Sequence, residues 1–306
     1  NRRGNMMTDE RIVDFDTAKL ESIHRHEQRG YFSLKGLRQG PDISTLTVGS
    51  WWELDQIFKM YPGQFVVVSG LAGSGKSTFL FNMLVTMARI HGTRSFMYVP
   101  ENELHLKRKL RSIWPGDDAG FGHYAEFQCF VQSAMPNDYD TEPQDLSWVL
   151  NKAIVAIEKD GVDVLLIDPW NELEHAKPPN MLMTDYIRLC LMYLKQFARA
   201  YGVTVILVAH PTKAVTENGG RTPLLSDIEG SMNWYNKCDN GLIVVRDYEK
   251  KTTRVISAKV RELGAGKIGQ CWFDVDPDTG IFIPQYGGFS EERDTTGGHS
   301  GNRRRD

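Results

Sequence analysis

The sequence predicts an α/β fold, with a mostly parallel twisted sheet flanked by helices. Continuous Val/Ile/Leu strands alternate with amphipathic helical segments from Gln64 onward. Strands of this kind are buried on both faces, which is typical of a parallel sheet covered by helices. After residue 240, three short strands follow each other with short turns. We expect these to be C-terminal antiparallel strands that extend the sheet.

The elements follow in order along the chain. The parallel strands are predicted at 65–69, 95–99, 127–132, 162–169 and 203–210. Helices are expected between them, because apolar residues recur there at helical spacing; their predicted ranges are 76–91, near 103–113, 144–159 and 184–201. The expected antiparallel strands are GLIVVRD, TTRVISAKV and GQCWFDVD.

The domain organisation follows from composition. Residues 1–40 are weakly patterned and predict an N-terminal arm or linker that is partly disordered. Residues 41–284 predict one large domain, and the polar segment 285–306 predicts a disordered tail. The chain does not begin with Met, so we expect that a further domain can precede it in the natural protein.

Composition excludes several classes of protein. The 306 residues contain 41% hydrophobic and 25% charged residues, as in ordinary globular proteins, and the net charge is -3. Nucleic acid would therefore be bound by local loops and not by a global basic field. No apolar stretch reaches the length of a membrane span, so no membrane partner is expected. The four cysteines are not at metal-ligand spacing and predict buried free thiols: Cys129, Cys190, Cys238 and Cys271.

A phosphate-binding loop is the most specific motif. Gly70–Ser77 fits G-x-x-x-x-G-K-[ST], with a predicted strand before it and a helix after it. Its backbone N–H groups and the helix N-terminus favour phosphate, Lys76 reaches the β- and γ-phosphates, and Ser77 offers a hydroxyl to Mg²⁺. We predict ATP or another NTP with Mg²⁺, bound by Gly70, Ala72, Gly73, Ser74, Gly75, Lys76, Ser77 and Thr78.

Three further polar residues follow predicted strands. Asp168 ends an apolar strand and is the expected second Mg²⁺ ligand; otherwise it caps a turn before a proline. Glu101 could orient the attacking water, or could be a helix N-terminal carboxylate. His210 could sense γ-phosphate, or could be an ordinary surface histidine. Open α/β sheets bind ligands at this edge, which favours the functional interpretations.

Six segments together resemble a known family. In order they are SGLAGSGKST, YVPENEL, LLIDPWNELEH, ILVAHPTK, DIEGSMNWYNKCDNGLIVVRD and AKVRELGAGKIG. Over about residues 45–275 the chain resembles the RecA-like core of the DnaB-type replicative helicases. It is most similar to the branch that holds Twinkle and the phage primase-helicases. The resemblance implies a RecA-like ATPase/helicase domain over 41–284.

The resemblance also implies residue roles. Glu101 matches the family's catalytic glutamate, and His210 matches the residue that reads γ-phosphate. Arg246 matches an arginine beside the nucleotide base. Lys259 and Arg261 match a basic pair that acts on the ATP of a neighbouring subunit, although a lone K-x-R also fits a solvated strand end. A homo-oligomeric ring, normally a hexamer, follows, with the N-terminal arm packed on a neighbour.

The DNA path is predicted on two loops. PTKAVTENGGRTPL, residues 211–224, directly follows His210, and relatives use the corresponding loop to grip single-stranded DNA. We expect Lys213, Gly220 and Arg221 to contact the phosphate backbone. Lys177 lies on a second loop. Each could instead belong to an ordinary surface loop.

The predicted function is that of an ATP-driven replicative DNA helicase, which moves on single-stranded DNA and unwinds a forked duplex as a ring. The alternatives are a RecA/RadA-type recombinase or KaiC-like ATPase, or a nucleotide switch or loader that does not unwind. A primase or polymerase is a further expected partner. The expected location is the cytoplasm or nucleoid, or the cytoplasm of a phage-infected cell, ahead of the mitochondrial matrix.

Overall fold

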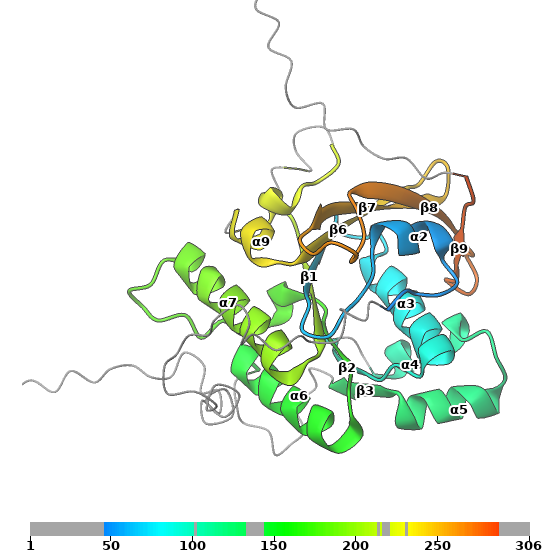
Figure 1. Cartoon of the computed structure of the whole chain (residues 1–306), viewed down its shortest axis with the longest axis horizontal. Coiled ribbons are helices and arrows are strands. Elements are labelled where there is room, and N and C mark those ends of the chain that lie inside the picture. Colours follow the sequence, from blue (N-terminus) through cyan, green and yellow to red (C-terminus); the bar gives the residue numbers. More distant parts are fainter. Residues whose placement is uncertain are drawn as a thin grey trace, which may run out of the picture.

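One sheet runs through the molecule (Figure 1). The computed structural model describes residues 46–100, 103–132, 144–212, 215, 221–229 and 232–287. Within them the strand order is β3-β2-β4-β5-β1-β6-β7-β8-β9. The strands are β1 (Phe65–Ser69), β2 (Ser95–Tyr98), β3 (Cys129–Gln132), β4 (Val164–Ile167), β5 (Thr204–Ala209), β6 (Asn240–Asp247), β7 (Thr252–Val260), β8 (Gly269–Val275) and β9 (Phe282–Pro284).

The sheet is parallel from β3 to β6 and antiparallel from β6 to β9. The predicted fold class is therefore confirmed. One detail differs, because β6 pairs in parallel with β1 and only its other edge meets β7 in the antiparallel sense. β6 is thus the last strand of the parallel part, and the antiparallel extension begins with β7.

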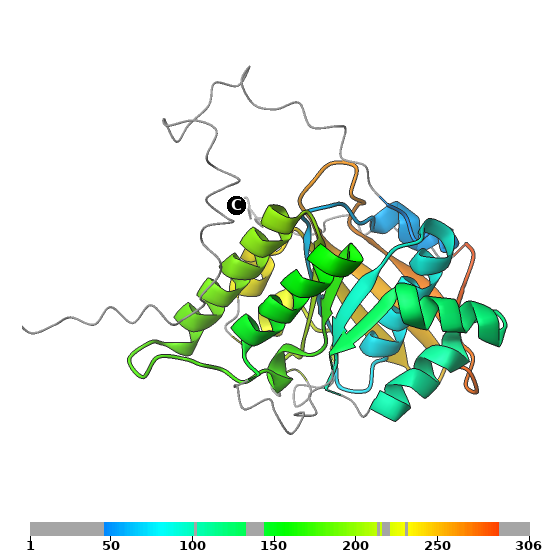
Figure 2. The same ribbon diagram turned by 90° about the horizontal axis from the view of Figure 1, so that it is seen from below.

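Helices cover both faces of the sheet (Figures 1 and 2). One face carries α3, α4 and α5, and the other carries α6 and α7, with α9 against α7. A short helix, α2, packs on β8. The helix bounds are α2 (Trp52–Ile57), α3 (Lys76–His91), α4 (Glu103–Ile113), α5 (Asp118–Phe127), α6 (Leu146–Asp160), α7 (Met183–Tyr201) and α9 (Met232–Lys237), with 3₁₀ turns η2 (Trp170–Glu172) and η3 (Leu225–Asp227).

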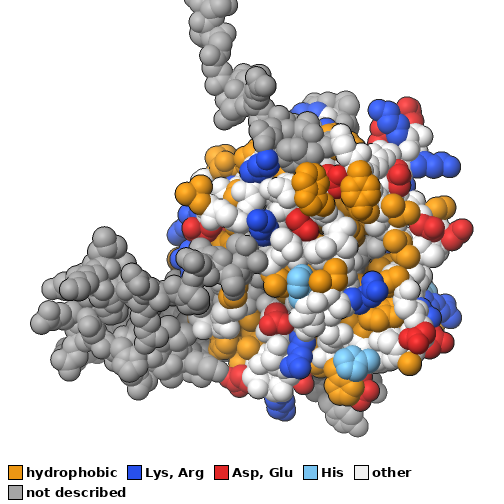
Figure 3. All heavy atoms as spheres, turned by 45° about the vertical axis from the view of Figure 1, so that its right-hand side comes forward, with side chains coloured by type: hydrophobic (Ala, Val, Ile, Leu, Met, Phe, Trp, Pro, Cys, Tyr) orange, Lys and Arg blue, Asp and Glu red, His pale blue; other side chains and the backbone are white. Residues whose placement is uncertain are grey.

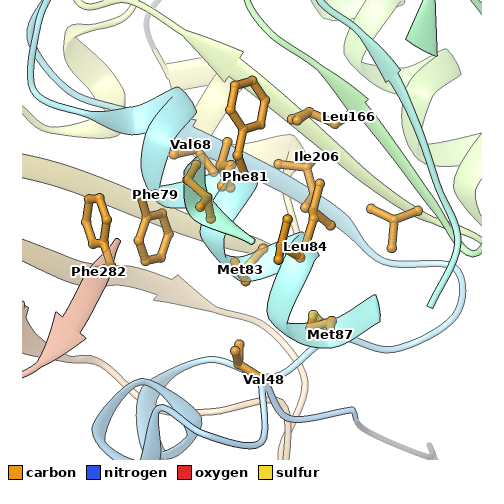
Figure 4. Packing of buried hydrophobic residues seen from close by; sticks show 14 of the residues in the cluster. Val48, Val68, Phe79, Phe81, Met83, Leu84, Met87, Leu166, Ile206 and Phe282 are labelled. Atoms are coloured by element: carbon orange, nitrogen blue, oxygen red, sulfur yellow. The ribbon is translucent and has the colours of Figure 1, made fainter. Parts of the chain in front are cut away.

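The central strand β1 has alternating faces. Val66 and Val68 belong to the hydrophobic core under α3, whereas Phe65 and Val67 belong to the core under α6 and α7. All four side chains are 0% exposed, as expected for a strand covered on both faces. Figure 4 shows the α3 side, where residues of the helix meet Val68. The β9 residue Phe282 lies there beside Phe79, with ring centroids 5.7 Å apart.

Three of the described helices were not predicted from the sequence: α2, α5 and the short α9. No element was predicted for segment 52–57, which forms α2 with Leu54 and Ile57 fully buried. Phe127 was placed at the start of a strand, but ends α5. Its helix begins at an Asp117 side chain that accepts a hydrogen bond from the Gly120 N–H. The helices α2 and α5 are short and acquire their stability from tertiary packing.

Further predictions concern the cysteines, the two ends of the chain and membrane-spanning helices. All four cysteines are free and buried, as expected. The predicted arm, 1–40, and most of the predicted tail, 285–306, lie outside the described residues. Among the described residues, no helix combines the length and the hydropathy needed to cross a membrane.

The loop between β7 and β8 offers a test of the packing. A Cβ at Gly266 (φ +124) would lie 2.2 Å from the backbone oxygen of Ile57, whereas Gly264 (φ +91) has open space. We expect Gly264→Ala to lower the unfolding free energy by about 1 kcal/mol through backbone strain. Gly266→Ala should lower it by about 3 kcal/mol or more, because overlap with rigid backbone adds to strain. Urea denaturation of both variants checks this, and equal losses would contradict the close approach.

Candidate nucleotide site and DNA-facing loop

The candidate site lies where the parallel strands end. Ser69 of β1 is level with Ala209 of β5, and Tyr98 of β2 is level with Ile167 of β4. The residues that follow these strands therefore meet at one edge of the sheet. They include the phosphate loop after β1, Asp168 after β4 and His210 after β5. Glu101, expected after β2, lies outside the described residues, although its neighbour Pro100 is described.

A cavity of about 490 Å³ occupies this edge. The phosphate-loop residues that line it are Gly73, Gly75, Lys76, Ser77 and Thr78. The other side is lined by Pro100, Lys109, Asp168, Pro169, Glu172 and His210. The structure thus brings five of the eight predicted phosphate-binding residues together with Asp168 and His210, whereas Gly70, Ala72 and Ser74 do not line the cavity.

The phosphate loop is shaped to hold an anion. Gly73 and Gly75 both have positive φ, and α3 begins at Lys76 directly after Gly75. Within the described chain, no side chain caps the first turn of α3. The first N–H groups of a helix carry partial positive charge, and here they are available to phosphate oxygens.

Lys76 is a buried cation. Its ammonium donates to the backbone oxygens of Gly70 at 2.9 Å and Leu71 at 2.8 Å, and the residue is only 5% exposed. Burial lowers the pKa of Lys76 to about 8, while the Asp168 carboxylate acts in the opposite direction. A phosphate beside this ammonium would replace the solvation that burial removes, so the site favours a bound anion.

The ligands for a divalent cation are in the same cavity. Asp168 is 4% exposed, directly follows β4 and lines the same cavity as Ser77. A carboxylate and a hydroxyl are the hard oxygen ligands that Mg²⁺ prefers, with water and phosphate oxygens completing the shell. These two residues therefore fit a magnesium–nucleotide complex.

His210 is held as a neutral imidazole. Burial, followed by the nearby Lys76 cation, keeps its pKa below the ordinary value, although a hydrogen bond with the Gly70 backbone and the Glu172 carboxylate oppose this. Its backbone N–H donates to the Asn171 side chain at 3.4 Å. This environment favours the neutral imidazole over the imidazolium.

Two charged residues that line the cavity, Glu172 and Lys109, were not predicted from the sequence. Glu172 lies on η2, four residues after Asp168, and Lys109 comes from α4, with its ammonium 5.5 Å from the Phe81 ring centroid. Glu172 was within reach of sequence reasoning, because it belongs to the DPWNE segment that was singled out. Nothing local marks Lys109 among its basic neighbours on α4.

The β6–β7 hairpin approaches the phosphate loop. The Tyr248 hydroxyl donates to the Gly73 backbone oxygen at 2.9 Å. Arg246, two residues earlier, donates to the Thr253 hydroxyl at 2.9 Å, which fixes the side chain along the hairpin. The predicted contact of Arg246 with a nucleotide base stays a prediction.

Lys259 and Arg261 lie near the amino ends of the parallel strands, at the end of the sheet opposite to the phosphate loop. Val260 pairs with Asn240, which is level with Val66 near the start of β1. A strand rises about 3.3 Å per residue, so the phosphate loop begins roughly 13 Å further along the sheet. Arg261 donates to the Asn236 backbone oxygen at 2.8 Å and its Nε is 3.2 Å from an Asp239 carboxylate oxygen. Neither cation belongs to the cavity of its own chain.

Of the predicted DNA-binding residues, the structure describes Lys177 and Arg221, and each is paired within its own segment. Lys213 and Gly220 lie outside the described residues. Lys177 donates to the backbone oxygens of Pro178 and Met181, within its own loop. Arg221 pairs with Asp227. Figure 3 shows positive and negative side chains interspersed on one face, in line with the absence of a global basic field.

A family model described as an AAA domain matches residues 55–215, more than half of the chain. The chain belongs to this family. It is 30% identical over 253 residues to a Twinkle homolog protein, chloroplastic/mitochondrial, of Arabidopsis thaliana, covering 76% of this chain and 35% of the relative. It is 20% identical over 300 residues to the replicative DNA helicase DnaB of Mycoplasma genitalium, covering 90% of this chain and 61% of the relative.

Solved structures agree on the fold of this AAA-family chain. The ATPase domain of G40P matches with a TM-score of 0.64 at 19% identity, covering 88% of this chain and 96% of that domain. A DnaB-like replicative helicase, described with its interactions with primase, matches with a TM-score of 0.62 at 20% identity, covering 88% and 66%. The chain thus shares the fold of these helicase ATPase domains. It spans about a third to three fifths of the length of these curated relatives.

The state of His210 gives a testable prediction. A neutral amide can replace a neutral imidazole, so His210→Gln should keep a substantial part of the ATPase rate, whereas His210→Ala should lose about tenfold or more. Because the pKa of His210 is lowered, the wild-type rate should show no titration of this residue between about pH 6.5 and 8. ATPase assays across this range check both points. A Gln variant as inactive as the Ala variant would contradict the view that a neutral hydrogen-bonding side chain suffices at this position.

Proposed function

We propose that this chain is the ATP-driven motor domain of a replicative DNA helicase, which acts as a ring on single-stranded DNA. The observation that carries the proposal is the division of the expected catalytic groups between two edges of the sheet. Lys76, Ser77, Asp168 and His210 line one cavity, whereas Lys259 and Arg261 lie at the opposite edge. A site with all these groups needs a second copy of the chain.

Each residue then has a task in phosphoryl transfer. The phosphate loop and the α3 N-terminus hold the phosphates, and the Lys76 ammonium neutralises charge on the β- and γ-phosphates. Ser77 and Asp168 would hold Mg²⁺, which would supply positive charge against the charge that develops on the phosphoryl group. Glu101 orients the attacking water. Arg261 of a neighbouring copy, with Lys259, stabilises charge on the transferred group.

Hydrolysis reaches DNA through His210. Its imidazole lies in the phosphate cavity, and the candidate DNA loop, residues 211–224, begins at the next residue. A change in γ-phosphate contacts at His210 would therefore act on the first residues of the loop. This supports a motor in which each hydrolysis step shifts the grip on a strand.

Strand displacement tests the proposed function directly. With ATP and Mg²⁺, the wild-type chain should release the shorter strand of a forked duplex, and Lys76→Ala should not, because the phosphates lose their buried cation. Fluorescence of a labelled strand measures the release. ATPase activity without strand release, in the wild type, would favour a recombinase-like or switch ATPase instead.

Arg261→Ala tests the shared site. The variant should bind ATP like the wild type but hydrolyse it about 10³-fold more slowly, because an arginine finger contributes at least that much. Mixing the variant into wild-type protein should lower the specific ATPase rate more steeply than simple dilution does. Arg188→Ala, which removes an exposed arginine on α7 from its pair with Asp185, is the matched control. A rate that falls only in proportion to dilution would contradict action on a neighbour.

Lys213→Ala tests the DNA loop. If Lys213 neutralises one phosphate, the variant should bind single-stranded oligonucleotide more weakly. The slope of log affinity against log salt concentration should become shallower by about 1. Anisotropy titrations at several salt concentrations measure this slope. A weaker affinity with an unchanged slope would remove Lys213 from the DNA path.

A further inference from the structure

The candidate DNA loop is attached at its entry to the segment that ends η3. Pro211 forms an antiparallel bridge with Ile228, and the Thr212 N–H donates to the backbone oxygen of Asp227 at 2.9 Å. These contacts begin one residue after His210. We call Pro211 and Thr212 the entry foot of the loop.

The same Asp227 holds the exit of the loop through its side chain. The two terminal guanidinium nitrogens of Arg221, Nη1 and Nη2, donate to the two carboxylate oxygens of Asp227 at 2.7 Å. The Leu224 N–H donates to Oδ2 of Asp227 at 2.6 Å. We call residues 221–224 the exit foot. A two-pronged arginine–carboxylate pair fixes direction as well as distance, which a single contact does not. One residue thus ties both feet, with its backbone oxygen on one side and its carboxylate on the other.

Asp227 is itself firmly placed. Leu225, in the same 3₁₀ turn, is 2% exposed and packs so closely on Gly241 of β6 that a Cβ there would lie 2.2 Å from it. Ile228, on the other side, is 3% exposed. The exit foot has a second attachment, because Arg254 of β7 donates to the Thr222 hydroxyl at 2.8 Å.

From these contacts we propose that Asp227 is a positioning residue that makes the two feet of the DNA loop move together with His210. The inference rests on the proposed function and deepens it. Arg221 then serves the loop as the partner of Asp227 and not as a phosphate contact, which revises the role expected from the sequence. We call the contacts of Asp227 with both feet the clasp. Without the clasp, a displacement at His210 would move the entry foot alone and would not reach the DNA-binding part of the loop.

The charges of Asp227 and Arg221 favour a contact that persists at neutral pH. The Arg221 hydrogen bonds, followed by that from the Leu224 N–H, hold the pKa of Asp227 below its ordinary value. The carboxylate is therefore ionised at neutral pH, and the pair is lost only in acid. The Asp227 side chain is 13% exposed and that of Arg221 is 49% exposed. Water and a DNA phosphate can therefore approach the guanidinium but reach the carboxylate less easily.

The test compares Asp227→Asn, Arg221→Lys, Arg221→Gln and the Asp227→Asn/Arg221→Gln double variant. The readouts are basal ATPase, ATPase with single-stranded oligonucleotide, and the salt slope of oligonucleotide affinity. We expect Asp227→Asn to keep its basal rate but to lose DNA stimulation by about tenfold, because a small misplacement of a grip costs that much or more. Arg221→Lys should lose nearly as much, since an ammonium cannot form the two-pronged pair. The double variant should be no worse than Asp227→Asn.

The salt slope separates a clasp from a DNA contact. With a clasp, all variants keep the wild-type slope. If Arg221 instead contacts phosphate, Arg221→Gln flattens the slope by about 1, Arg221→Lys restores it, and Asp227→Asn behaves like the wild type, which overturns the inference. Asp185→Asn, which removes an exposed carboxylate from its pair with Arg188 on α7, is the control and should change nothing.

Two further outcomes are decisive. If oligonucleotide stimulates the wild type and every variant equally, the clasp is wrong while the proposed motor stands. If oligonucleotide does not stimulate the wild type at all, the proposed function fails and the inference fails with it. Thermal unfolding of each variant shows whether lost stimulation accompanies lost folding. Loss of stimulation that scales with loss of folded protein overturns the positioning role.

Discussion

The register of β1 between β5 and β6 is the constraint on which the rest depends. It sets Ser69 level with Ala209 and Ile243, so the phosphate loop and His210 emerge side by side. A slip of one residue would turn Val66 and Val68 from the α3 core toward the opposite helices. The buried alternation on this strand therefore fixes both the hydrophobic layers and the place of the chemistry.

The site concentrates charge where water is scarce. Lys76 is 5% exposed and Asp168 is 4% exposed, and each influences the other through the same cavity. Taking these groups out of water is costly, and the cost is offset only when opposite charges are correctly placed. Triphosphate oxygens supply negative charge beside Lys76, and a divalent cation would supply positive charge beside Asp168. This electrostatic balance makes the cavity suited to a metal–nucleotide complex more than to either alone.

The amino end of β1 is linked to Arg261 through Asp239. Asp239 is 1% exposed, and its carboxylate accepts the Phe65 N–H at 3.0 Å, contacts Lys195 and lies 3.2 Å from Arg261. Arg261 is thus anchored to the first residue of the strand whose last residue leads into the phosphate loop. One short strand therefore connects the phosphate loop with the anchor of Arg261.

The strands, the long helices and the phosphate loop could be read from the chain, because each follows from a local pattern. Apolar runs mark buried strands, and Gly-x-x-x-x-Gly-Lys-Ser holds its geometry within eight residues. Elements without such a pattern were missed, as with α5, whose sequence carries Gly120 and Gly122 and whose helix depends on packing. The placement of β6 beside β1 also depended on contacts between distant segments.

Among the site residues, local chemistry indicated which side chains could bind phosphate, but not which were committed elsewhere. Arg221 appears as a free cation in the sequence, and only folding sets it against Asp227. Lys109 appears as one of several basic residues, and only the packing of α4 turns it toward the nucleotide cavity. The physical reason is that a local motif specifies backbone shape over a few residues. The partner of a charged side chain depends instead on which distant segments the hydrophobic core brings together.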